Sequence, residues 1–318
     1  MSEDGVKTVD LSATSPDHAV TIEPFSVNRI EVMRGPKSLI KTPVTIGGVV
    51  NVVRYEIPEE KHEIIHGSAG TYYETANEGY LGSVNLTAPL NNFVLRGEVS
   101  GRKANDLETQ IGRLNNSYSE NRNYSLGGSY IFDKGFIGAS FRKFDLNYGV
   151  PGGFIGAHPE GVDIEMYRNQ LNLKGKMNFA DGFLNNLEFN GSRALYRHKE
   201  FEASGRIGSE FKIISNLGYI NLHHKNIFFL NNGIIGTSIE HRDLTIGGFV
   251  FTPPSKSLNF SSYIFENFNI THFSFEFAAR YDYNRITPES SDPDAKIGFI
   301  REREFNTFSL SFSTLYDF

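Results

Sequence analysis

The sequence predicts an all-β, transmembrane, antiparallel β-barrel preceded by a small mixed α/β unit. Three observations lead to this prediction: a two-residue period through most of the chain, long strands, and breaks that alternate between short turns and long polar loops. Long amphipathic strands with short turns at one end and long loops at the other are typical of transmembrane β-barrels. Helical periodicity is nearly absent, and no apolar run reaches the roughly 18 residues that would indicate a transmembrane helix.

Residues 1–55 form the part that differs from the rest of the chain. Two short apolar runs, NRIEVM and GGVVNVV, flank the turn-rich segment RGPKSLIKTP. Short apolar runs bounded by Gly and Pro indicate strands. We therefore expect a compact unit in which strands are joined by a turn and a short helix.

The segment 271–284, THFSFEFAARYDYN, shows the two-residue period most clearly. Its Phe and Tyr residues fall on one parity, and its Ser, Glu, Arg and Asp residues fall on the other. Alternate residues of a strand point to opposite faces, so this strand has one aromatic and one polar face. We expect about a dozen such strands of about 9–15 residues, longer than the usual five or six. Tight turns are predicted at 132–135 and 179–182, and long loops at 103–118, 147–161 and 287–303.

The environment decides which face points inward. Lipid offers no hydrogen bonds to backbone groups, so strands can cross it only in a closed barrel. We expect the aromatic face to contact lipid and the polar face to line a wet lumen, with interfacial aromatic girdles at the strand ends. The girdle candidates are Tyr72, Tyr73, Tyr124, Tyr148, Tyr283 and Tyr316. A soluble β-sandwich or solenoid is the alternative, and the strand length and the lack of a long apolar central strand argue against it.

Composition excludes several classes of function. The formal charge of −6 is mild and spread along the chain, which argues against a nucleic-acid-binding surface. The absence of cysteine excludes disulfides, thiolate metal sites and cysteine nucleophiles. No nucleophile–base–acid arrangement is found, so we expect no enzyme. The first ten residues, MSEDGVKTVD, lack the basic and apolar regions of a signal peptide.

Residues 27–53, VNRIEVMRGPKSLIKTPVTIGGVVNVV, resemble the plug domain of TonB-dependent outer-membrane receptors. The resemblance lies in an RGP triplet followed at the family's interval by GGVVN: Arg34, Gly35, Pro36, Gly47, Gly48 and Asn51. Lys41 and Thr42 stand where the family usually has a tyrosine–glycine pair. The segments SPDHA, NYGVPGG, YRHKEFE and FTPPSKSLNFSSYIFEN are similar to the zinc-type metal and siderophore branch of the family.

The resemblance implies a domain arrangement and a function. Residues 1–55 would be the C-terminal part of the plug, and residues 56–318 the N-terminal part of the barrel. The protein would take up a metal ion or metal chelate, such as zinc or a ferric siderophore, without a cofactor of its own. It would lie in outer-membrane lipid and be energised by the TonB–ExbB–ExbD complex. An outer-membrane enzyme or adhesin without transport activity is the alternative.

The family also implies that this sequence is a fragment. Its members begin with a signal peptide and a TonB box, and their barrels have about 22 strands, which leaves a lumen wide enough for a plug. Here the plug begins midway, and only about half the strands are expected.

Asp17 and His18, in SPDHA, are candidate metal ligands. A carboxylate and an imidazole suit Zn²⁺ and similar divalent ions. The resemblance implies that this loop faces the extracellular cavity. The alternative is that Asp17 makes loop hydrogen bonds and His18 is exposed.

Four more residues are candidate ligand contacts: Tyr148, His158, His198 and Glu200. His198, Glu200 and Glu202 share one strand parity and would point the same way. The alternative is that they merely line a wet lumen, and that His158 is a solvated residue of a Gly-rich loop.

Other polar residues are given structural roles. The pairs His62/His66 and His223/His224 lie at strand ends and are not expected to bind a metal from one face. Arg34 is expected to pair with carboxylates of the plug or the barrel wall.

Overall fold

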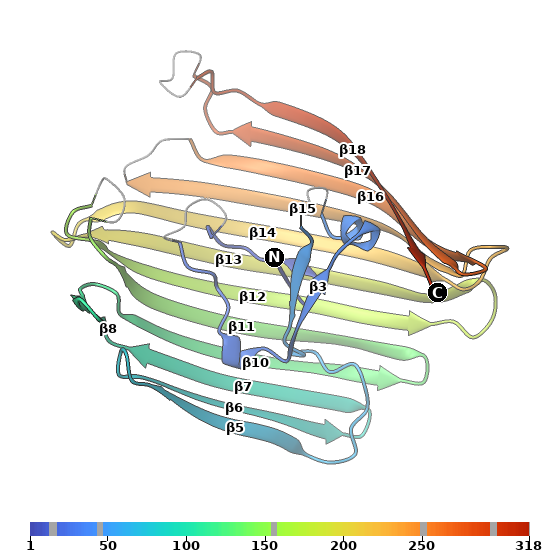
Figure 1. Ribbon diagram of the computed structural model, residues 1–318, viewed down its shortest axis with the longest axis horizontal. Helices are drawn as coiled ribbons and strands as arrows, with labels where there is room; N and C mark the ends of the chain where they lie inside the picture. The colour runs from blue at the N-terminus through green and yellow to red at the C-terminus, as the bar shows by residue number, and fades with distance from the viewer. Residues whose placement is uncertain (13–17, 43–46, 154–157, 249–252, 293–297, 318) are drawn as a thin grey trace.

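The computed structural model describes residues 1–12, 18–42, 47–153, 158–248, 253–292 and 298–317. These residues form a twelve-stranded antiparallel sheet, a four-stranded sheet and a two-stranded hairpin (Figure 1). The expected all-β antiparallel architecture is confirmed. None of the helices in this part of the chain has the length and apolar character to cross a membrane.

The described residues up to 57 are called the N-terminal unit. Its strands are β1 (Ser2–Glu3), β2 (Val6–Lys7), β3 (Arg29–Met33) and β4 (Val49–Val53), in the order β2-β1-β4-β3. Two 3₁₀ turns, η1 (Pro24–Ser26) and η2 (Pro36–Ile40), complete it.

Asn51 joins three parts of the N-terminal unit. Its side-chain oxygen accepts hydrogen bonds from the Ser2 hydroxyl at 2.8 Å and the Gly5 amide at 2.9 Å, and its amide donates to Glu31 at 2.9 Å. Gly48 precedes β4 at φ +120°, and a Cβ there would lie 2.5 Å from the Met33 carbonyl oxygen. Only glycine fits this approach without displacing the backbone.

The large sheet contains twelve sequential strands, with β5 and β18 at its edges. They are β5 (His66–Glu74), β6 (Gly79–Leu90), β7 (Phe93–Ala104), β10 (Ser119–Phe132), β11 (Gly135–Val150), β12 (Val162–Asn178), β13 (Leu184–Glu202), β14 (Ile207–His224), β15 (Asn232–Gly248), β16 (Ser255–Ile270), β17 (Phe273–Pro288) and β18 (Arg303–Tyr316). The hairpin β8 (Leu107–Thr109) and β9 (Gly112–Leu114) lies in the loop between β7 and β10. Several strands exceed the expected length, because backbone pairing continues into segments expected as loops.

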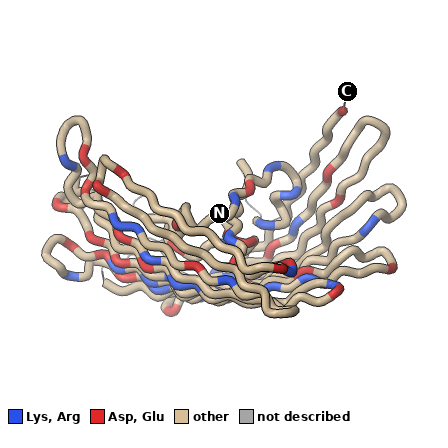
Figure 2. The backbone as a smooth tube through the Cα atoms, turned by 90° about the horizontal axis from the view of Figure 1, so that it is seen from below, with Lys and Arg blue, Asp and Glu red and all other residues tan. Residues whose placement is uncertain are grey.

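The large sheet curves, and the N-terminal unit lies on its concave side (Figure 2). In β17, Ala278 faces this side and packs with Leu39 and Ile40 of η2. Arg280, two residues on, donates a hydrogen bond to the Leu39 carbonyl at 3.0 Å. Residues of the other parity, such as Phe273, are exposed on the convex side. The aromatic face therefore points away from the N-terminal unit, as the sequence predicts for a wall whose polar face is inside.

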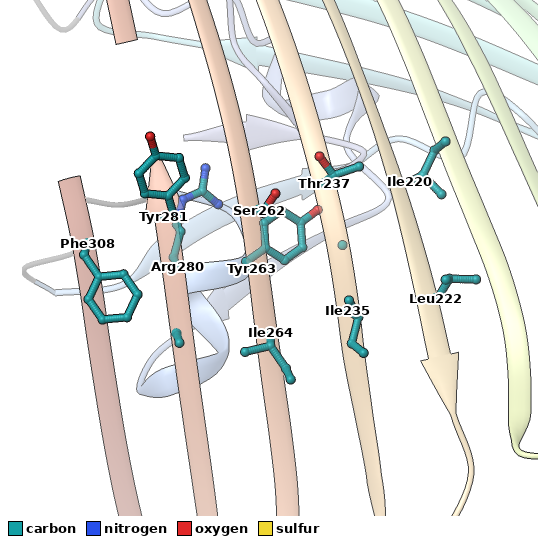
Figure 3. Close-up of a pocket in the computed structure, with 12 residues that line it drawn as sticks. Ile220, Leu222, Ile235, Thr237, Ser262, Tyr263, Ile264, Arg280, Tyr281 and Phe308 are labelled. Carbon is teal, nitrogen blue, oxygen red and sulfur yellow. The ribbon is translucent and has the colours of Figure 1, made fainter. Parts of the chain in front are cut away.

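The convex face over β14–β18 is apolar (Figure 3). A shallow depression there is lined by side chains from five neighbouring strands, among them Ile220, Ile235, Ile264, Tyr281 and Phe308. Ile220, Ile235 and Phe308 are about half exposed or more, at 49%, 52% and 68%. Exposed aliphatic and aromatic side chains over five strands would be costly in water and are suited to lipid.

A buried apolar cluster attaches the start of the chain to the concave face. Val9 and Leu11 pack in this cluster with Phe144 of β11, Ile164 of β12 and Tyr196 of β13. These contacts fix the segment that leads toward His18 against the sheet, and they position the site described next.

Candidate functional site

Three of the predicted residues meet where the N-terminal unit contacts β13. One carboxylate oxygen of Glu200 lies 3.2 Å from Nε2 of His18 and 3.2 Å from Nε2 of His198. The side chains are 17%, 9% and 0% exposed, respectively. His18 comes from the N-terminal unit and the other two from the wall, so both parts are needed to form this group.

Local structure explains the convergence. His198 and Glu200 are two residues apart on β13 and share its concave face. The ring centroids of His18 and His198 are 4.8 Å apart, with the planes at 74°. The ring of Phe211 on β14 packs edge-on against both imidazoles. The two imidazoles are thus held by packing as well as by polar contacts.

Each histidine has a second polar partner on Nδ1. Nδ1 of His18 lies 3.2 Å from the Leu11 carbonyl oxygen, and Nδ1 of His198 lies 3.0 Å from the Tyr196 hydroxyl. A carbonyl oxygen can only accept, so Nδ1 of His18 carries the hydrogen. In the neutral ring, Nε2 then presents its lone pair toward Glu200. A hydrogen bond on one imidazole nitrogen is the usual way of directing the other to a metal.

The dimensions suit one small cation. The ligand atoms of His18, His198 and Glu200 all lie within 4.8 Å of one another. Two imidazoles bound to one tetrahedral zinc ion through Zn–N bonds of about 2 Å would bring their ring centroids to about 5 Å, close to the separation of His18 and His198. Two imidazoles and a carboxylate form a three-ligand set that leaves the fourth position of a tetrahedral zinc ion open to water or another ligand.

The other predicted contacts surround this group. The Tyr148 hydroxyl accepts a hydrogen bond from the Ala19 amide at 2.9 Å, next to His18, and the Tyr148 side chain packs in the buried cluster with Val9 and Leu11. The expectation that Tyr148 belongs to a lipid-facing aromatic girdle is therefore wrong, because its side chain faces the N-terminal unit.

His158 lies farther out, with Nδ1 at 2.8 Å from a Glu202 oxygen and both side chains 38% exposed. Asp17 lies outside the described residues.

The residues of the RGP and GGVVN motifs lie in the N-terminal unit. Gly35 has φ +72° and precedes Pro36, the first residue of η2. Gly47 and Gly48 lead into β4, which contains Asn51. Arg34 is exposed and forms no ion pair with any residue that the structure describes, so the expected pairing is not found.

Other arginines make the buried ion pairs instead. Glu3 contacts Arg54 at 3.0 Å, Arg142 at 2.9 Å and also Arg168, and these four side chains are at most 1% exposed. Arg142 also contacts Glu56 at 2.5 Å. Sequence reasoning missed this network, although Arg142 and Arg168 lie on the polar parity of long predicted strands.

Burial alone would raise the pKa of the Glu3 carboxyl, but the guanidinium groups of Arg142, Arg168 and Arg54 outweigh it. They hold that pKa well below its ordinary value, so Glu3 remains ionised. The network therefore links the N-terminal unit to β11 and β12 through charged hydrogen bonds.

Comparison with solved structures identifies the fold. No protein-family model matches the sequence. The copper transporter OprC superposes with a TM-score of 0.76 at 12% identity, covering 93% of this chain and 49% of that chain. The FrpB iron transporter from Neisseria meningitidis gives 0.72 at 14% identity, covering 93% and 52%. The pyoverdine receptor FpvA from Pseudomonas aeruginosa gives 0.71 at 15% identity, covering 100% and 53%.

The chain spans about half the length of these structures. They are transporters and receptors, and none of them is an enzyme. At this identity the likeness is one of fold. The chain has the fold of about half of a TonB-dependent outer-membrane receptor.

Proposed function

We propose that this chain is part of an outer-membrane receptor that transports a divalent metal ion. In this proposal the N-terminal unit is part of the plug, and the twelve-stranded sheet is part of the barrel wall. The apolar convex face supports contact with lipid, since exposed Ile and Phe side chains cover its strands. The buried contacts of Glu3 and of Leu39 support a plug seated against the wall.

The group of His18, His198 and Glu200 supports a bare ion of the zinc type as the substrate. Imidazole and carboxylate ligands suit Zn²⁺ and neighbouring divalent metals. At exposures of 9%, 0% and 17%, these side chains are too enclosed for a bulky metal chelate to reach them, which favours a bare ion. A ferric siderophore is therefore the second candidate substrate.

The three ligand side chains come from two parts of the molecule, and this supports a simple mechanism for releasing the ion. A bound ion would join His18 of the plug to His198 and Glu200 of the wall. Any movement of the plug away from β13 would separate the ligands and lower the affinity for the ion. We propose that energy relayed by the TonB–ExbB–ExbD complex drives this movement, without covalent chemistry.

Metal titration of the complete gene product in detergent tests the proposal. His18→Ala and His198→Ala are each expected to lower Zn²⁺ affinity by more than about 100-fold, because loss of even an outer partner of a ligand typically costs about 10- to 100-fold. His241→Ala is the matched control, since this histidine is exposed on β15. Unchanged affinity in both site variants would remove the site, and retained uptake of a ferric siderophore with no zinc binding would favour the second substrate.

A further inference from the structure

A second histidine pair lies far from the site above. His62 belongs to the segment that connects β4 to β5, and His66 is the first residue of β5. Figure 1 shows β5 at one edge of the large sheet. Their ring centroids are 4.6 Å apart, with the planes at 48°. The two rings therefore lie side by side, and the chain bends between them at Glu63 and Ile64.

In each ring of this pair, Nε2 is placed to bind a further group. Nε2 of His62 is buried and has no hydrogen-bond partner among the described residues. Nδ1 of His66 lies 3.4 Å from the Ile64 carbonyl oxygen, which can only accept a hydrogen. The hydrogen of His66 is thereby favoured on Nδ1, and Nε2 is left with a lone pair. A buried nitrogen without a partner is unfavourable unless an ion or another group binds it.

We propose that His62 and His66 form a second metal site, which takes a borderline divalent cation such as Zn²⁺ or Cu²⁺. The centroid separation of 4.6 Å is close to the separation of about 5 Å expected for two imidazoles on one ion, as at His18 and His198. Imidazole nitrogens prefer these metals to Mg²⁺ or Ca²⁺. Two protein ligands leave the other positions to water, so the ion is held less tightly than by three.

The position of His62 and His66 in the sheet indicates a role for this second site. β5 and β13 run in the same direction, because an even number of antiparallel steps separates them in the sheet. His66 begins β5, whereas His198 is four residues from the end of β13 at Glu202. The two sites thus lie toward opposite ends of the sheet. If the proposed function holds, the pair at His62 receives the ion after its release from His18; the existence of the site does not depend on that function.

Counting bound metal tests the proposal. The complete gene product is titrated with Zn²⁺ as the parent, as His18→Ala/His198→Ala, as His62→Gln/His66→Gln and as the fourfold variant. We expect each double variant to lose one equivalent of bound zinc and the fourfold variant to lose two. His223→Gln/His224→Gln is the matched control and is expected to lose none. An unchanged stoichiometry in His62→Gln/His66→Gln overturns the proposal, whatever the result for His18 and His198.

A second experiment, with Cu²⁺ and a spin label, tests the location of the site at His62 and His66. The sequence contains no cysteine, so Ser68→Cys near His66 and Ser204→Cys near Glu202 each provide one labelling position. In the His18→Ala/His198→Ala background, Cu²⁺ is expected to enhance relaxation of the label at 68 and not at 204. Loss of this enhancement in His62→Gln/His66→Gln supports the site, and its persistence overturns it. His66→Gln alone, at an exposed position, gives the same test if the double variant does not accumulate.

Discussion

Two of the buried polar contacts between the N-terminal unit and the large sheet differ in kind. At the first, Glu3 is surrounded by three guanidinium groups, which are always charged and have only donors. At the second, Glu200 faces two imidazoles, which keep a lone pair when neutral. The arginine contact cannot accept a cation, whereas the histidine contact can. The first contact is therefore suited to attachment, and the second is suited to the ion binding proposed above.

Glu3→Gln is expected to have the largest effect of the substitutions considered, because it removes the carboxylate at the centre of the arginine contact. The substitution leaves buried guanidinium groups without their carboxylate, and removing one partner of a buried ion pair typically costs about 3–5 kcal/mol. We expect backbone amides of β1 and β4 to exchange hydrogen more than about 100-fold faster in the complete gene product, where each factor of ten corresponds to about 1.4 kcal/mol.

Glu120→Gln is the control for this substitution. Glu120 pairs with Arg122 at 2.9 Å, and the side chains are 34% and 62% exposed, so the pair is expected to contribute at most about 1 kcal/mol. Equal effects of the two substitutions would contradict the attachment role of Glu3.

The pH dependence of stability tests the Glu3 contact in a second way. The pKa of Glu3 is lowered in the folded state, so its stabilising contribution is present above the unfolded value of about 4.3 and is lost as pH falls toward the folded value. Exchange protection in β1 should therefore be unchanged between about pH 7 and pH 5 and should fall in stronger acid. The Gln variant should lack this component of the acid loss.

The fold was predictable because its signal is local and repeated. In β17, parity alone assigned Phe273 to the outer face and Arg280 to the inner face, as observed. Strand ends were less predictable, since pairing with a neighbour extends β11 to Val150, through residues expected in a loop. The number of strands emerged from turn signals, whereas the position of the N-terminal unit depends on contacts between distant residues.

The site was predictable only in part. Parity placed His198 and Glu200 on one face, and the family resemblance pointed to His18, but nothing local in the sequence joins residues 182 positions apart. The ion pairs of Glu3 with Arg142 and Arg168 have the same long-range character. The approach of His62 to His66 depends on the fold of a short connecting segment, which shows no periodicity from which to predict it.

Tyr196→Phe separates hydrogen bonding from packing at the histidine contact. The substitution removes the hydroxyl 3.0 Å from Nδ1 of His198 and keeps the ring. We expect Zn²⁺ affinity to fall by about 10- to 100-fold, because an outer partner orients the imidazole and raises its basicity. Phe211→Leu is the control, since Phe211 packs against the same ring without a hydrogen bond. Equal losses in the two variants would assign the effect to packing.

His158→Ala is expected to have the smallest effect on Zn²⁺ affinity. It tests whether His158 belongs to the metal site. His158 contacts Glu202 at 2.8 Å, but both side chains are 38% exposed, and a pair this accessible to water contributes little. We expect Zn²⁺ affinity to change by less than about threefold, which corresponds to about 0.6 kcal/mol. The measurement is the same titration as for His18→Ala, with Glu202→Gln as the partner variant. A loss of more than about tenfold in both would mean that ions bind first at His158 and Glu202, and the buried group of three would no longer account for recognition by itself.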